Sequence, residues 1–228
     1  MGNAIVLGAS GETGKVIVKL LLNLNYKVIG TYNSRRLEGT AKLTALHLDM
    51  ASIISINKFL KKIENQKEVD VVINTISRKP TFGKIETNSI EKYKKDMEVN
   101  CLNFIYIIKN ILGNLNRGAN IISILTEAVV NPTPFISSYL TSKYALLGFM
   151  KSLDLELKEK EIYVNSISPG MMETEFISSF PSFIKSKYLS THKSFIKPQQ
   201  VGEVVQEILK NPMSGKNVEV FDKNDDRD

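Results

Sequence analysis

The chain has 228 residues, 43% of them hydrophobic and 24% charged, which is an ordinary globular composition and long enough to bury a sizeable core. The lone Cys101 excludes an internal disulfide and a cysteine-rich zinc site, and two isolated histidines, His47 and His192, argue against a histidine metal centre. No apolar run approaches the roughly 18 residues that span a bilayer. We therefore expect a cytoplasmic protein without a metal or a membrane anchor.

The net charge is +6, from 30 basic and 24 acidic residues. Proteins that bind nucleic acid usually concentrate their lysines and arginines on one element. Here the lysines are scattered along the chain, which favours a solvated surface and no nucleic-acid partner.

Short apolar runs alternate with longer segments of helical spacing. The runs predict strands at residues 3–7, 27–32, 44–48, 69–74, 120–125, 163–168 and 217–221. Helices are predicted at residues 14–24, 52–65, 89–115, 137–161 and 198–210. Nearly continuous apolar strands in this alternation predict an α/β fold, a doubly wound parallel sheet of about seven strands with helices on both faces. No linker divides the chain, so a single domain over residues 1–228 is expected.

Three glycines, Gly8, Gly11 and Gly14, lie between the first strand and the first helix. Lacking a Cβ, glycine permits a tight turn, a close approach to a diphosphate and close packing of helix on strand. The diphosphate would lie at the helix N-terminus. The loop, with Ser10 and Thr13, therefore predicts a dinucleotide site.

Glu12 is unexpected in that loop, because a carboxylate repels phosphates. We expect its side chain to point outward, where a negative charge stabilises the helix N-terminus.

The residues after the second strand bear on the choice of cofactor. Asn33, Arg35 and Arg36 follow that strand, and no carboxylate precedes Glu38. An acidic residue here would accept the ribose hydroxyls of NAD, whereas an arginine accommodates the 2′-phosphate of NADP. NADP(H) is favoured over NAD(H); in the alternative interpretation both arginines are ordinary solvated side chains.

Tyr139 and Lys143 are four residues apart on a predicted helix and therefore share a face. A neighbouring ammonium favours the phenolate and lowers the tyrosine pKa, which would make the pair a usable general acid/base. Thr126 ends the fifth strand and Asn100 lies in the preceding long helix.

These landmarks, together with Asp49 after the third strand, Asn74 ending the fourth, and Pro169-Gly170 followed by Thr174, resemble the short-chain dehydrogenase/reductase family. The resemblance covers nearly the whole chain and implies the single-domain, Rossmann-like type with a Tyr-x-x-x-Lys pair.

The resemblance implies a role for each landmark. Tyr139 would be the acid/base, Lys143 would hold the nicotinamide ribose and lower the tyrosine pKa, and Thr126 would hydrogen-bond the substrate oxygen. Asn100 would support a water-mediated proton relay to Lys143. Asp49 would contact the adenine, and Thr174 the carboxamide. The implied cofactor site comprises Gly8, Ser10, Gly11, Thr13, Gly14, Asn33, Arg35, Arg36, Asp49, Asn74, Tyr139, Lys143, Pro169, Gly170 and Thr174.

The chain departs from the family pattern in three places. The glycine spacing looks more like the extended and atypical branches, Thr75-Ile76 replaces the Ala-Gly after Asn74, and Thr126 replaces a serine. Threonine keeps the hydroxyl, but its β-branch restricts χ1. The leading hypothesis is an NADP(H)-dependent oxidoreductase that interconverts a carbonyl and an alcohol; the alternative is a non-catalytic or weakly active cofactor-binding sensor or scaffold.

The substrate lid is expected at about residues 171–197, a segment rich in methionine and phenylalanine that also carries Lys185, Lys187, Lys193 and Lys197. The composition suits an apolar or carrier-bound substrate, or equally a helix packed on the core. It does not distinguish a ketoacyl thioester from a steroid, a sugar or a polyketide. The resemblance also implies a homodimer or homotetramer formed through the helices that carry Asn100 and Tyr139.

Overall fold

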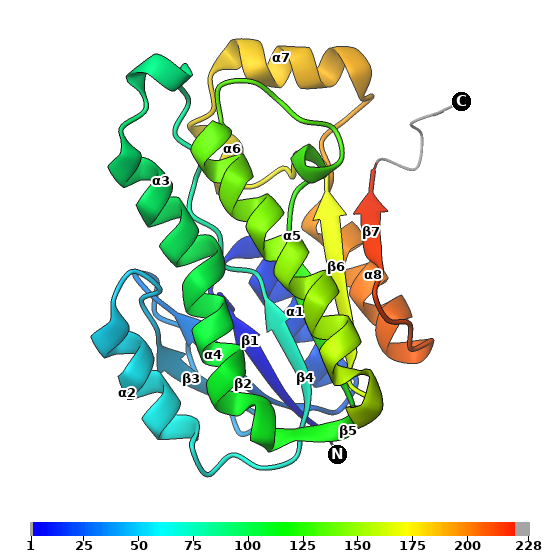
Figure 1. Ribbon diagram of the computed structural model, residues 1–228. Coiled ribbons are helices and arrows are strands. Elements are labelled where there is room, and N and C mark those ends of the chain that lie inside the picture. Colours follow the sequence, from blue (N-terminus) through cyan, green and yellow to red (C-terminus); the bar gives the residue numbers. More distant parts are fainter. Residues whose placement is uncertain (1, 222–228) are drawn as a thin grey trace.

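The computed structural model describes residues 2–221. Its centre is a parallel sheet of seven strands in the order β3-β2-β1-β4-β5-β6-β7 (Figure 1). Ile5 of β1 pairs with Ile29 of β2 on one side and with Val72 of β4 on the other. The strands are β1 Asn3–Leu7, β2 Lys27–Tyr32, β3 Leu43–His47, β4 Val69–Asn74, β5 Leu115–Ile124, β6 Tyr163–Pro169 and β7 Asn217–Val220. The predicted fold class is confirmed.

Helices cover both faces of this sheet (Figure 1). One face is covered by α1 Glu12–Asn23 and α8 Pro198–Lys210, and the other by α2 Ile53–Ile63, α4 Asn103–Ile111 and α5 Ser137–Leu157. Helix α3 Ile90–Met97 continues the line of α4 and lies beside α5 (Figure 1). Two further helices, α6 Glu175–Ser178 and α7 Ser182–Thr191, lie outside these layers, and α7 crosses above the carboxyl ends of the strands. Among the helices formed by residues 2–221, none has the length and apolar character needed to cross a membrane.

The two cores follow from the alternation of side chains along each strand. In β1, Ile5 and Leu7 enter the core under α2, α4 and α5, whereas Ala4 and Val6 enter the core under α1 and α8. All four are at most 1% exposed. A strand buried on both faces therefore appears in the sequence as a continuous apolar run.

Most predicted boundaries agree with the structure to within a residue or two. Ser52 caps α2, and its hydroxyl accepts a hydrogen bond from the Ser55 N–H at 3.3 Å. Strand β3 begins one residue earlier than predicted, and β5 begins five residues earlier, at Leu115. The polar start of β5 gives no apolar signal, which explains the missed residues.

The long helix predicted at residues 89–115 is wrong as one continuous α-helix. A π-helical turn at Glu98–Leu102 separates α3 from α4. Such turns are inserted into α-helices mainly at functional sites, and periodicity does not reveal them. Asn100 lies in the middle of this turn.

Helix α2 offers a matched test of this packing. Ile56 is fully buried, whereas Ile54, two positions away, is 66% exposed. We expect Ile56→Ala to lower the free energy of unfolding by about 2–5 kcal/mol, because it leaves a cavity in the core. Ile54→Ala should change it by less than about 0.5 kcal/mol. Urea titration followed by circular dichroism measures both, and equal losses would contradict the assignment of the buried face.

Candidate active site

The glycine loop makes a tight turn at the carboxyl end of β1. Gly8 has φ of 84°, a left-handed conformation that disfavours other residues. Its N–H donates to Thr31 Oγ1 at 2.9 Å, and its carbonyl accepts from the Gly11 N–H at 3.1 Å. A Cβ on Gly14 would collide with the Gly8 carbonyl oxygen, so α1 packs this close only with glycine at that position.

A cleft of about 660 Å³ runs from this loop across the carboxyl ends of the strands. Most predicted cofactor residues line it: Gly8, Ser10, Gly11, Thr13, Gly14, Asn33, Arg35, Asp49, Tyr139 and Thr174. Arg36 is exposed and outside the lining, and Asn74 and Lys143 are buried behind it. Pro169 and Gly170 line a second cavity.

The expectation that Glu12 points outward is wrong. Its carboxylate lines the cleft and accepts a hydrogen bond from the Glu175 N–H, at the start of α6, at 2.7 Å. The Glu175 side chain in turn pairs with Arg35, and its carbonyl accepts from Lys79 Nζ at 2.8 Å. The N–H groups at the start of a helix attract a carboxylate. Glu12 is the first residue of α1, and its carboxylate also binds an N–H group at the start of α6. We call the contacts of Glu12, Arg35 and Lys79 with Glu175 the Glu175 clasp.

The turn after β4 is held by Asn74 and by Thr75, one of the residues that depart from the family pattern. Asn74 Oδ1 accepts from the Ile76 N–H at 3.1 Å, and its Nδ2 donates to Ser123 Oγ at 3.3 Å. The Thr75 hydroxyl donates to the Leu7 carbonyl at 2.9 Å. Thr75 therefore ties this turn to the end of β1, beside the glycine loop.

Tyr139 lies in the first turn of α5 and is 5% exposed. Burial raises its pKa to about 12; hydrogen bonds with the side chains of Ser77 and Thr126 act in the opposite direction, and the negative charge of Asp96 adds to the rise. The hydroxyl is therefore protonated at neutral pH.

Lys143 lies beneath Tyr139 and has no exposed surface. Its ammonium donates to the Ile124 carbonyl at 3.2 Å and is 5.8 Å from the Tyr139 ring centroid. Burial lowers the pKa of Lys143 to about 8. The lowering of the tyrosine pKa by this ammonium, expected from the sequence, is not found here; desolvation dominates at both groups.

Asn100 connects the π-helical turn to two other segments of the chain. Its Oδ1 accepts from the Arg78 N–H at 2.7 Å, and its Nδ2 donates to Ser142 Oγ at 3.0 Å. The Arg78 guanidinium pairs with the fully buried Asp96 at 2.7 Å. Asn100 thus joins the loop after β4 to α5, the helix that carries Tyr139 and Lys143.

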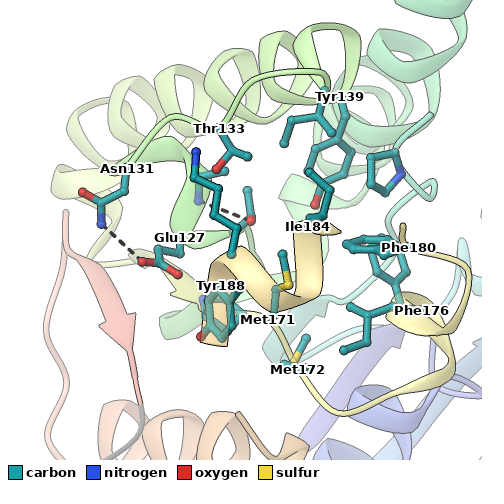
Figure 2. A pocket seen from close by; sticks show the side chains of 18 of the residues that line it. Glu127, Asn131, Thr133, Tyr139, Met171, Met172, Phe176, Phe180, Ile184 and Tyr188 are labelled. Atoms are coloured by element: carbon teal, nitrogen blue, oxygen red, sulfur yellow. Dashed lines mark hydrogen bonds between the residues drawn. The ribbon is translucent and has the colours of Figure 1, made fainter. Parts of the chain in front are cut away.

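A second cavity, of about 280 Å³, adjoins the cleft. The two share Leu125, Tyr139, Met172, Thr174 and Phe176. Thr126, which caps a short turn at Glu127–Val129, lines only the second cavity. Its remaining walls are largely apolar and come from residues 171–192 and from the loop before α5 (Figure 2). A Cβ on Gly170 would collide with the Tyr188 hydroxyl, so glycine lets α7 approach β6.

Sequence reasoning missed a group of polar residues in and behind the walls of the two cavities. Ser77 and Arg78 follow a predicted strand end and were detectable by that position. Asp96, Glu127 and His192 carry no local signal, because their neighbours come from distant segments. Glu127 Oε1 lies 3.0 Å from His192 Nε2, although the two are 65 residues apart in the chain.

Comparisons with known proteins identify the family of this chain. The short chain dehydrogenase family model matches residues 2–183. An uncharacterized oxidoreductase of Schizosaccharomyces pombe is 30% identical over 184 residues, which is 77% of this chain and 62% of that protein. The chain therefore spans less than two thirds of that relative. The 3-oxoacyl-[acyl-carrier-protein] reductase of Buchnera aphidicola is 28% identical over 190 residues, 78% of this chain and 77% of the reductase.

Solved structures share the fold. A short chain dehydrogenase family protein from Francisella tularensis has a TM-score of 0.88 at 27% identity, covering 96% of this chain and 97% of that one. A blue fluorescent protein from a metagenomic library, in complex with NADPH, has a TM-score of 0.83 at 19% identity and 96% coverage of each chain. A 4-hydroxyisoleucine dehydrogenase complexed with NADH has a TM-score of 0.85 at 21% identity and 97% coverage of each. With its family model matched over residues 2–183, the chain belongs to the short chain dehydrogenase family, a family of oxidoreductases.

Proposed function

We propose that the protein is an NADP(H)-dependent oxidoreductase that interconverts a carbonyl and an alcohol. The observation that carries this proposal is the meeting of two cavities at Tyr139. One has the glycine cradle of a dinucleotide site, and the other has the size and apolar lining of a small-molecule pocket. A proton donor at their junction is where such a reaction needs it.

The residues of the cleft fit a nicotinamide dinucleotide. Gly8, Gly11 and Gly14 leave room for a diphosphate at the N-terminus of α1, Asp49 would contact the adenine, and Arg35 would meet a 2′-phosphate. Solved relatives hold NADPH or NADH, which supports a nicotinamide cofactor. When bound, the cofactor supplies or accepts the hydride.

Tyr139 and the side chains around it transfer a proton to or from the substrate oxygen. Its hydroxyl, protonated at neutral pH, donates to the carbonyl oxygen in reduction, and Thr126 orients that oxygen. Lys143 sits below the ring and would hold the ribose while supporting return of the proton. Asn100 fixes the π-helical turn against α5, which keeps Lys143 in position.

Residues 171–197 form the lid of the substrate cavity. Met171, Phe176, Phe180 and Ile184 from this segment line the cavity, which supports an apolar substrate body. Phe183 of α7 is 57% exposed and packs edge to face against Phe135, with ring centroids 6.3 Å apart. The whole chain acts as one domain with this lid.

The chain pairs into a homodimer or homotetramer through the faces of α4 and α5. Tyr106 of α4, Tyr144 and Leu155 of α5, and Leu102 just before α4 are between 36% and 73% exposed. Exposed apolar side chains on these helices favour an interface between copies.

Tyr139→Phe tests the proton donor. We expect turnover of carbonyl substrates to fall by about a hundredfold to ten-thousandfold, because the transition state loses its general acid. NADPH affinity, followed by cofactor fluorescence, should stay within about threefold. Retained turnover would contradict the role of Tyr139, whereas tight cofactor binding by a wild type that turns over no carbonyl would favour the sensor or scaffold.

Arg35→Ala and Arg36→Ala form a matched pair for cofactor choice, because only Arg35 lines the cleft. Charge-assisted hydrogen bonds contribute about 1.5–3 kcal/mol. Arg35→Ala should therefore weaken NADPH binding by about tenfold to a hundredfold and leave NADH binding nearly unchanged. Arg36→Ala should alter neither in calorimetric titrations. Equal losses for both cofactors would refute the NADP assignment.

The raised pKa of Tyr139 sets the sign of the pH dependence. Reduction uses the protonated hydroxyl, which prevails throughout the neutral range. Alcohol oxidation needs the phenolate, whose fraction grows about tenfold per pH unit below the pKa. Between about pH 6 and about pH 8, we expect kcat/KM for oxidation to rise with pH and kcat/KM for reduction to stay level. An oxidation rate that falls with pH would overturn the assignment.

A further inference from the structure

The Tyr139 hydroxyl has a hydroxyl neighbour in each of the two cavities. Thr126 lines the second cavity together with Tyr139, and Ser77 lines the cofactor cleft together with Tyr139. The side chains of both residues hydrogen-bond the Tyr139 side chain. Thr126 already has a role in the proposed reaction, whereas Ser77 has none.

The turn that carries Ser77 is fixed through the next residue, Arg78. The Arg78 N–H donates to Asn100 Oδ1 at 2.7 Å. The Arg78 guanidinium pairs with Asp96 Oδ1, also at 2.7 Å. Both ends of Arg78 are therefore held, and Ser77 has little freedom to move away from Tyr139.

The burial of Asp96 makes its pairing with Arg78 informative. The Asp96 side chain has no exposed surface, and its Oδ2 has no hydrogen-bond partner within residues 2–221. A buried ion pair adds little stability compared with apolar residues of similar size, because both charges lose their hydration. Stability therefore does not explain the pair, whereas its hold on the turn at Ser77 gives it a purpose.

The Ser77 hydroxyl is able to respond to a charge that develops on Tyr139. It has a single hydrogen, which rotates about the Cβ–Oγ bond. Its contact with the Arg78 carbonyl, at 3.4 Å, is long for a hydrogen bond between two oxygens. A phenolate oxygen is a stronger acceptor than a carbonyl, because hydrogen bonds to ionised groups are shorter and stronger.

We propose that Ser77 stabilises the Tyr139 oxygen during proton transfer, from the cofactor side of the site, and that the Arg78–Asp96 pair positions Ser77 for this role. The proposal rests on the proposed function of Tyr139. In carbonyl reduction the O–H bond of Tyr139 breaks, its proton goes to the substrate oxygen, and its electron pair stays on the phenolate oxygen, to which Ser77 donates. In alcohol oxidation the same proton returns to Tyr139.

Ser77→Ala removes the hydroxyl, and Ser77→Thr keeps it. The substrate is the fastest of a panel of apolar methyl ketones with NADPH, and the matching secondary alcohol serves for the reverse reaction. Ser77→Ala should lower kcat and kcat/KM together by about tenfold to a hundredfold, the range expected for a hydrogen bond to a charged group. The factor should be the same in both directions, because Tyr139 is protonated in both ground states at neutral pH.

The alternative is that the Ser77 hydroxyl only holds the cofactor, since it lines the cleft. KM and the NADPH affinity, followed by cofactor fluorescence, should stay within about threefold in Ser77→Ala. Ser77→Thr should recover most of the lost kcat. Ser152→Ala is the matched control: Ser152 is an exposed serine of the same helix as Tyr139 and lines neither cavity, so its loss should leave kcat unchanged.

Arg78→Met combined with Asp96→Leu tests the positioning role. Replacing both charges leaves no lone buried carboxylate, which favours folding. If the pair acts through Ser77, Ser77→Ala should cost less than about threefold in this background, since residues of one network are not additive. The Asp96 charge, which also acts on Tyr139, is absent from both arms of this comparison. A loss as large as in the wild type would refute the positioning role.

Tyrosine labelled with ¹³C at Cζ reports the contact without turnover. The Tyr139 signal, identified by its absence from Tyr139→Phe, should move in Ser77→Ala and return toward its wild-type position in Ser77→Thr. These single variants test the hydroxyl even if the Arg78→Met, Asp96→Leu variant does not fold.

An unchanged kcat or Tyr139 signal in Ser77→Ala, a loss confined to KM or to NADPH affinity, or no recovery by threonine would overturn the proposal and leave the role of Tyr139 intact. A Tyr139 signal that responds to Ser77→Ala in a protein that reduces no ketone of the panel would leave the hydroxyl contact standing and refute the proposed oxidoreductase function. The spectroscopic and kinetic readings therefore separate the two failures.

Discussion

Desolvation at the junction of β5 and α5 governs the chemistry of the site. Lys143 has no exposed surface, and Tyr139 almost none, because both enter the core at the carboxyl edge of the sheet. Removing charged groups from water favours their neutral forms, so burial raises the pKa of the phenol and lowers the pKa of the ammonium. The hydroxyl thus holds its proton, and Lys143 can exchange one near neutral pH. The surrounding hydrogen bonds position groups whose protonation is set by their burial.

The sheet that creates this edge was predictable, because its physical cause lies in local sequence. Apolar runs such as that of β4 must be covered on both faces, and right-handed crossovers then place all strand carboxyl ends together. The glycine loop was predictable for the same reason, since Gly14 meets a steric limit that its neighbours impose. Helical spacing was enough to place Tyr139 and Lys143 on one face of a helix, whereas their proposed roles came from the resemblance to the family.

What sequence alone missed depends on contacts between distant segments. Glu12 is drawn into the cleft by an N–H group of α6, which lies 163 residues further along the chain. The π-helical turn at Asn100 carries no distinguishing composition, and that asparagine is hydrogen-bonded to Arg78 and Ser142 from other segments of the chain. Neither spacing nor composition contains these pairings, so the sequence predicted the members of the site better than the partners that hold them.

The Glu175 clasp connects α6, whose Phe176 and Ile177 line the second cavity, to residues of the cofactor cleft. Glu175 is the first residue of α6, within the proposed lid of the substrate cavity. The groups that hold it belong to the cofactor cleft. Arg35 cannot give its full charge to Glu175 and to a phosphate at once, so a ligand that engages Arg35 weakens the hold on α6. Such coupling is reciprocal: a substrate that rearranges the lid must change cofactor affinity by the same factor as the cofactor changes substrate affinity. On the proposed function, the start of α6 and one guanidinium would therefore link the binding of cofactor to the binding of substrate.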